Sequence, residues 1–110
     1  MSTYFHDPKN RESRELLPGI TARTFWGEKM LLSLIDLAPN AVIPSHSHPH
    51  EQVGSVLAGE FTLTIAEETR LVRQGDIYIV PGNVKHSVVV GDAAARALEA
   101  FSPVREEYKY

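Results

Sequence analysis

The chain has 110 residues, a net charge of −3 and no cysteine. This length suits a single domain, and without thiolates any metal ion must take nitrogen and oxygen ligands. The charge shows no basic excess, which argues against nucleic acid or an anionic membrane as a partner. The N-terminus lacks an apolar signal core and no apolar run approaches the ~20 residues of a membrane span, so we expect a cytoplasmic protein.

Residues 1–18 are charged and lack hydrophobic periodicity, which predicts an irregular lead-in or an edge strand. Residues 19–110 are expected to form one β domain. Its expected strands, in chain order, span residues 20–25, 30–37, 41–43, 52–57, 61–65, 70–73, 76–80, 86–90 and 95–101. Helix propensity competes in residues 93–100, but their place at the end of a series of strands favours a strand. Regular turn signals with no long helical pattern between strands predict an all-β barrel or sandwich.

The segment after the third expected strand is rich in histidine. His46, His48 and His50 occupy alternate positions, and Gln52 follows two residues later. In an extended chain, residues two apart point to the same side, so His46 and His48 can reach one ion together. Another histidine, His86, lies far along the chain. A local pair of ligands with one distant ligand is typical of a metal site that joins two strands, so the sequence predicts metal binding.

Two spacings in the chain resemble the motifs of the small cupins. The first family motif, G-x5-H-x-H-x3,4-E-x6-G, is similar to His46-x-His48-x3-Gln52-x6-Gly59. The second, G-x5-P-x-G-x2-H-x3-N, is similar to Gly75-x5-Pro81-x-Asn83-x2-His86. The resemblance covers about residues 30–101. It implies an all-β fold, the double-stranded β-helix or cupin jelly-roll barrel, with a metal in its mouth.

The chain departs from these motifs at four places. The glycine that precedes the first histidine is missing, and Gln52 stands where the family usually has Glu. Asn83 replaces a turn glycine, which is tolerable because Asn enters the left-handed backbone region relatively easily. Val90 stands where the second motif ends in Asn.

The run His-Ser-His-Pro-His-Glu-Gln and the tail Phe101-Ser-Pro-Val-Arg105 resemble a subgroup, the pectin-degradation cupins. Those proteins linearise 4,5-unsaturated uronate monosaccharides. The resemblance implies a metal site of His46, His48, Gln52 and His86. It also implies an acidic residue two positions before the tail Phe, which here is Glu99 where Asp is usual, with Arg105 nearby.

Three imidazoles and one amide oxygen suit a divalent transition ion, such as Ni, Zn, Mn, Fe or Co. All four ligands are neutral, so the ion keeps its full charge and favours Lewis-acid chemistry over an oxidised iron state. His50 is the rival of Gln52, because it shares the alternation of His46 and His48. His6 lies in the polar lead-in and is expected to be exposed.

Two further residues are candidates for catalysis. Glu99 lies in an apolar strand, and facing the barrel mouth it would be desolvated, with a raised pKa suited to proton transfer. The alternative is a charge at the strand edge. Arg105 has a planar fork suited to a substrate carboxylate. The alternative is a surface ion pair with Glu106 or Glu107.

The sequence is compatible with three functions. The first is a metal-dependent isomerase that linearises 4,5-unsaturated uronates, with Glu99 moving the proton and Arg105 holding the substrate carboxylate. The second is an iron-dependent dioxygenase, and the third is a non-catalytic module that binds a small molecule or a metal. Fold alone does not choose among them. The family resemblance also implies a homodimer.

Overall fold

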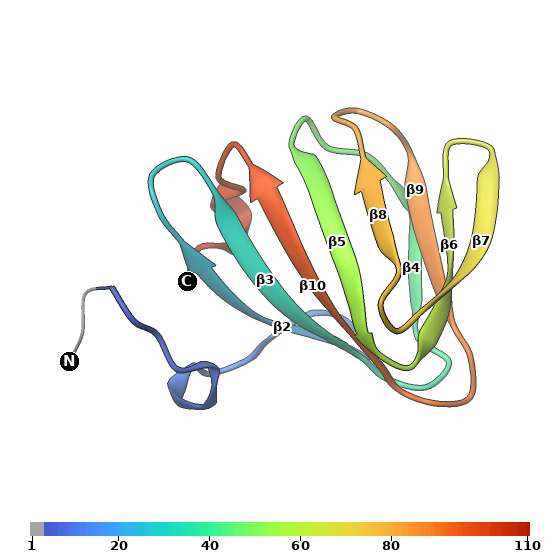
Figure 1. The fold of residues 1–110 in the computed structure, drawn as a ribbon, viewed down its shortest axis with the longest axis horizontal. Coiled ribbons are helices and arrows are strands. Elements are labelled where there is room, and N and C mark those ends of the chain that lie inside the picture. The colour runs from blue at the N-terminus through green and yellow to red at the C-terminus, as the bar shows by residue number, and fades with distance from the viewer. Residues whose placement is uncertain (1–3) are drawn as a thin grey trace.

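The computed structural model describes residues 4–110, which form two facing antiparallel sheets and two single turns of 3-10 helix (Figure 1). One sheet has six strands in the order β1-β2-β3-β10-β5-β8, and the other has four in the order β4-β9-β6-β7. The elements are η1 Pro8–Asn10, β1 Arg14–Leu17, β2 Ile20–Trp26, β3 Leu31–Leu37, β4 Val42–His46, β5 Glu51–Ala58, β6 Glu60–Ile65, β7 Glu68–Arg73, β8 Ile77–Val80, β9 His86–Val90, β10 Ala95–Ser102 and η2 Glu106–Tyr108.

The all-β prediction is confirmed, and every expected strand is present with ends that shift by a few residues. The alternation of Phe61, Leu63 and Ile65 that predicts a half-buried strand falls in β6, where Phe61 and Leu63 are buried. The last expected element is strand β10 rather than a helix. Its neighbours β3 and β5 pair with it over its whole length, and this long-range pairing outweighs local helix propensity.

The lead-in has its own structure within the described part of the chain. Residues 4–13 are irregular apart from η1, and β1 pairs with β2 of the same chain as the edge strand of the six-stranded sheet. The first three residues of the predicted lead-in lie outside the described residues. Within residues 4–110, no helix is long and apolar enough to cross a membrane.

The core lies between the two sheets, where alternate residues of each strand point inward. Its most buried large side chains include Ile20, Leu31, Val56, Phe61 and Phe101. Burial of such side chains stabilises the fold by roughly 1.5–3 kcal/mol each. The two sheets therefore pack around an apolar core, and the polar residues of the candidate site lie at one end of it.

One row across the six-stranded sheet breaks this apolar pattern. The register places Thr24 opposite Ser33, Ser33 opposite Glu99, Glu99 opposite Gly54, and Gly54 opposite Tyr78. The row thus crosses strands β2, β3, β10, β5 and β8. Residues two apart point to the same face, and the buried apolar neighbours of this row include Leu31 and Ile35 on β3 and Ala97 and Phe101 on β10.

The turn at Asn83 brings the two histidine segments together. Asn83 has φ +66°, in the left-handed region that the sequence predicted Asn to accept at this position. Its backbone N–H donates to the carbonyl of His48 over 2.7 Å. The loop between β8 and β9 is therefore joined to the loop that carries His48, and β9 begins with His86.

Candidate metal and proton-transfer site

Three of the predicted ligands meet in space. His46 ends β4, His86 begins the neighbouring strand β9, and the register pairs these two residues directly. Their ring centroids are 4.2 Å apart, and the ring of His48 lies 4.9 Å from that of His86. One ring nitrogen from each of the three residues lies within 4.8 Å of the others, a spacing at which they can hold one metal ion.

The backbone fixes the orientation of each imidazole. The Nδ1 atoms of His46 and His86 lie 2.9 Å from the carbonyls of Pro44 and Val84, and that of His48 lies 3.0 Å from the carbonyl of His50. A carbonyl only accepts, so each Nδ1 carries the proton and each Nε2 keeps its lone pair. Such a hydrogen bond on the outer nitrogen is what orients metal-binding histidines in general.

Burial keeps two of these imidazoles neutral. Burial lowers the pKa of His86 to about 4, and its Nε2 is enclosed without a hydrogen-bond partner among the described residues. The pKa of His48 is also lowered, first by burial and then by the positive charge of Arg105. Neutral imidazole is the form that binds metal.

Gln52 links the histidines to a carboxylate. It is buried on β5, where its Nε2 donates to Oε2 of Glu99 over 2.7 Å and its Oε1 lies 3.1 Å from Nε2 of His48. With the proton of His48 on Nδ1, both atoms of the second contact are acceptors. Two buried acceptors at this distance are stabilised by a cation between them, so this contact and the enclosed Nε2 of His86 both fit a metal ion.

Glu99 lies on β10 and faces the same cavity. Its Oε2 also accepts a hydrogen bond of 2.7 Å from the hydroxyl of Tyr78, while Oε1 makes no hydrogen bond within residues 4–110. Burial raises the pKa of Glu99, although the two hydrogen bonds and Arg105 favour its charged form. Burial likewise raises the pKa of Tyr78, with Glu99 adding to the effect, so the phenol stays protonated and donates.

Arg105 lies in the tail after β10. It forms the ion pair with Glu107 and also lines the cavity, where a substrate carboxylate would bind. Its Nε contacts Oε1 of Glu107 at 2.6 Å, and its guanidinium lies 4.0 Å from the ring centroid of Tyr108. The pair lowers the pKa of Glu107, although burial alone would raise it. The side chain of Arg105 is 13% exposed and also lines the cavity, so its ion pair does not remove it from the site.

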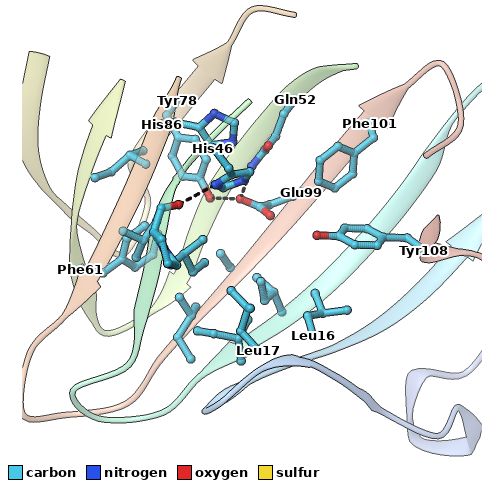
Figure 2. A pocket seen from close by; sticks show the side chains of 18 of the residues that line it. Leu16, Leu17, His46, Gln52, Phe61, Tyr78, His86, Glu99, Phe101 and Tyr108 are labelled. Atoms are coloured by element: carbon cyan, nitrogen blue, oxygen red, sulfur yellow. Dashed lines mark hydrogen bonds between the residues drawn. The ribbon is translucent and has the colours of Figure 1, made fainter. Parts of the chain in front are cut away.

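The cavity has a volume of about 440 Å³ and a polar and an apolar end. Figure 2 shows His46, His86, Gln52, Tyr78 and Glu99 together at one end, with Leu16 and Leu17 of β1 at the other. Phe101 and Tyr108 flank the polar end, with their rings packed edge to face. The tail is held there by the Thr24 hydroxyl, which donates to the carbonyl of Tyr108 over 2.5 Å.

The remaining histidines lie outside the three-residue group. His50 is adjacent, with its ring centroid 5.6 Å from that of His48, but its ligand atoms are not among those that converge. His6 is exposed and packs near Phe25. Tyr78 and Gly54, which the structure places beside Glu99, are not among the residues predicted for the site. A Tyr between two strand isoleucines is itself a signal, because a buried hydroxyl needs a partner.

Comparison with known proteins identifies the family. The family model described as "Cupin domain" matches residues 33–101. The chain is 30% identical to the pectin degradation protein KdgF of Dickeya dadantii (strain 3937), over 98% of this chain and 99% of that protein.

Solved structures share the fold. An RmlC-like cupin from Shewanella frigidimarina superposes with a TM-score of 0.91 at 25% identity, covering 98% of this chain and 97% of the other. KdgF from a Halomonas species superposes with a TM-score of 0.90 at 23% identity, covering 98% and 100%, which at this identity shows a common fold. The predicted jelly roll is therefore confirmed, and the chain belongs to the cupin family.

Proposed function

We propose that the protein is a metal-dependent isomerase that linearises 4,5-unsaturated uronate monosaccharides in pectin and uronate breakdown. The likeness to the Dickeya pectin degradation protein along nearly the whole of both chains supports the substrate class. The observation that carries the reaction type is the position of Glu99. Its carboxylate stands in the cavity beside the histidine group, joined to it by Gln52.

His46, His48 and His86 would hold the ion through Nε2, with Oε1 of Gln52 as the fourth ligand. A divalent transition ion bound there supplies Lewis-acid polarisation of a substrate oxygen. The four side chains contribute no negative charge. Gln52 is kept in the required orientation by Glu99, because only its NH₂ group can donate to the carboxylate.

The reaction rearranges bonds without adding or removing atoms. The bond between C1 and the ring oxygen breaks, the C1 hydroxyl becomes an aldehyde, and the enol left at C5 becomes a ketone as C4 gains a proton. Glu99 would take the hydroxyl proton and deliver one to C4. Oε1 is the atom available for this, since Oε2 already accepts two hydrogen bonds. Burial raises the pKa of Glu99, which brings it closer to the working pH of a general acid and base.

Arg105 would hold the carboxylate of the substrate. Its guanidinium is fixed by Glu107 through Nε and by the face of Tyr108, which leaves the other nitrogens to form a fork. The cavity volume of about 440 Å³ lies within the range of pockets for small ligands, roughly 300–1,000 Å³, and suits a single sugar ring.

The test is an assay of 4,5-unsaturated galacturonate that follows loss of its ene absorbance, with the protein loaded in turn with Mn, Fe, Co, Ni or Zn. Enzyme-free controls containing each metal measure spontaneous ring opening. Turnover above that background with at least one ion supports the proposal. If no ion gives an excess, the isomerase assignment is wrong. Oxygen uptake confined to the iron-loaded protein would then indicate the dioxygenase class.

A further inference from the structure

The carboxylate of Glu99 is held from one side by a residue on the far edge of its sheet. Tyr78 lies on β8 and Glu99 on β10, and β5 runs between them. Their side chains nevertheless meet, with 2.7 Å between the phenol oxygen and Oε2 of Glu99. Figure 2 shows this contact as a dashed line, and the strand order requires the ring of Tyr78 to cross over β5 to make it.

Gly54 is the position of β5 that this ring crosses. The register places Gly54 directly between Tyr78 and Glu99. A Cβ atom at Gly54 would lie 2.4 Å from two ring carbons of Tyr78 and 2.5 Å from its hydroxyl oxygen. Because the ring is the far end of a side chain, it would move in preference to the backbone. Every residue larger than glycine at position 54 would therefore push the hydroxyl away from Glu99.

Phe61 limits where the ring of Tyr78 can go. The two rings pack edge to face with centroids 6.2 Å apart, and Tyr78 is 7% exposed. Close packing of this kind fixes the ring in one orientation. The hydroxyl is therefore presented to Glu99 by the packing of the core.

We propose that Tyr78 is a positioning residue for Glu99, and that Gly54 is the position that admits it. Together with Gln52, Tyr78 holds Oε2 of Glu99, so that Oε1 remains directed to the substrate. This inference rests on the proposed function, in which Glu99 moves the proton. It adds two residues that occupy unspecified positions of the family motifs, Gly54 between Gln52 and Gly59 and Tyr78 between Gly75 and Pro81.

Tyr78→Phe removes the hydroxyl and keeps the ring. We expect kcat to fall roughly 10–100-fold, since a small misplacement of a reacting group can cost this much. KM and metal content are expected to stay close to wild type, because the substrate anchor and the ligands are unchanged. Gly54→Ala should lower kcat in the same way. The double variant should lose little more than either single variant, because both act through one contact.

Gly27→Ala is the matched control, because a Cβ there meets nothing within 4 Å. It should leave kcat unchanged. A loss of kcat in Gly54→Ala with full activity in Gly27→Ala and Tyr78→Phe would overturn the proposal, since the hydroxyl would then be irrelevant. Unchanged kcat in both Tyr78→Phe and Gly54→Ala would overturn it as well.

Crystal structures of wild type and Tyr78→Phe separate this inference from the proposed function. We expect the carboxylate of Glu99 to rotate or to occupy two orientations in the variant. A wild-type protein that never exceeds the enzyme-free rate would refute the isomerase function. The positioning role of Tyr78 would then be tested by the two crystal structures alone. A Glu99 carboxylate that keeps its wild-type orientation in Tyr78→Phe would refute that role, whatever the substrate.

Discussion

Gln52 donates a hydrogen bond of 2.7 Å to Glu99, and this contact connects the candidate metal ligands to the candidate acid and base. It directs the amide oxygen toward His48 and uses one of the two carboxylate oxygens. The residue that would complete the ligand set is thus also one that orients the proton carrier. Ligand geometry and proton transfer are therefore expected to change together when Gln52 is altered.

Gln52→Glu tests this connection. The variant should retain or tighten metal binding, because a carboxylate replaces an amide oxygen. It should lower kcat, because the added charge weakens Lewis acidity and because two carboxylates would face each other where a donor now meets an acceptor. Elemental analysis and kinetics on the same preparations check this. A variant with bound metal and wild-type kcat would contradict it.

Single alanine replacements of His46, His48 and His86 should each lower metal content sharply, because losing one of few ligands removes much of the binding free energy. His50→Ala is the matched control in the same loop and should bind metal as wild type does. Metal-to-protein ratios after dialysis measure this. Near-stoichiometric metal in all three variants, or its loss in His50→Ala, would show that the ligand set is wrong.

The metal-free protein should lose stability as the pH falls from 6.5 to 4. His86 has a folded-state pKa of about 4 against an ordinary 6.5, so in this interval the unfolded state binds more protons. The contribution reaches about 3 kcal/mol by pH 4. Glu99, with its raised pKa, acts in the opposite direction. The free energy of unfolding in urea, measured against pH in the presence of a chelator for wild type and His86→Gln, isolates the contribution of His86. Equal pH slopes in the two proteins would contradict the prediction.

Arg105→Ala should mainly raise KM, provided that the arginine grips the substrate carboxylate equally in ground and transition states. Arg105→Lys should restore little of the affinity, because the planar fork is lost. Arg70→Ala removes an arginine from an exposed pair with Glu68 on β7, away from the site, and serves as the control. Steady-state kinetics measure KM in each variant. An unchanged KM in Arg105→Ala would show that Arg105 does not bind the substrate carboxylate and serves only in its ion pair with Glu107.

The strands were predictable because local patterns encode them. The alternation in residues 61–65 predicts a strand, and turn residues such as Asn83 predict where strands end, without information from the rest of the chain. The convergence of His46 with His86 needed the motif spacings, since their pairing joins two strands far apart in sequence.

Tyr78 could not be assigned a role from the sequence. Its place between Ile77 and Ile79 indicates a hydroxyl that needs a partner when buried, but the identity of that partner, Glu99, depends on the order β10-β5-β8 and on a glycine in the middle strand. Arg105 shows a different limit. The sequence offers the substrate anchor and the ion pair as alternatives, but the multiple donors of one guanidinium allow both at once.

Glu99→Gln shows whether Glu99 moves the proton in the proposed metal-dependent uronate isomerisation. The variant keeps the shape of the side chain and removes its proton chemistry. With unsaturated galacturonate and metal-loaded protein, we predict a fall in kcat of ~10²–10⁴-fold, corrected for the enzyme-free rate, with metal content unchanged. A Glu99→Gln protein that turns over the sugar as fast as wild type would show that Glu99 does not move the proton.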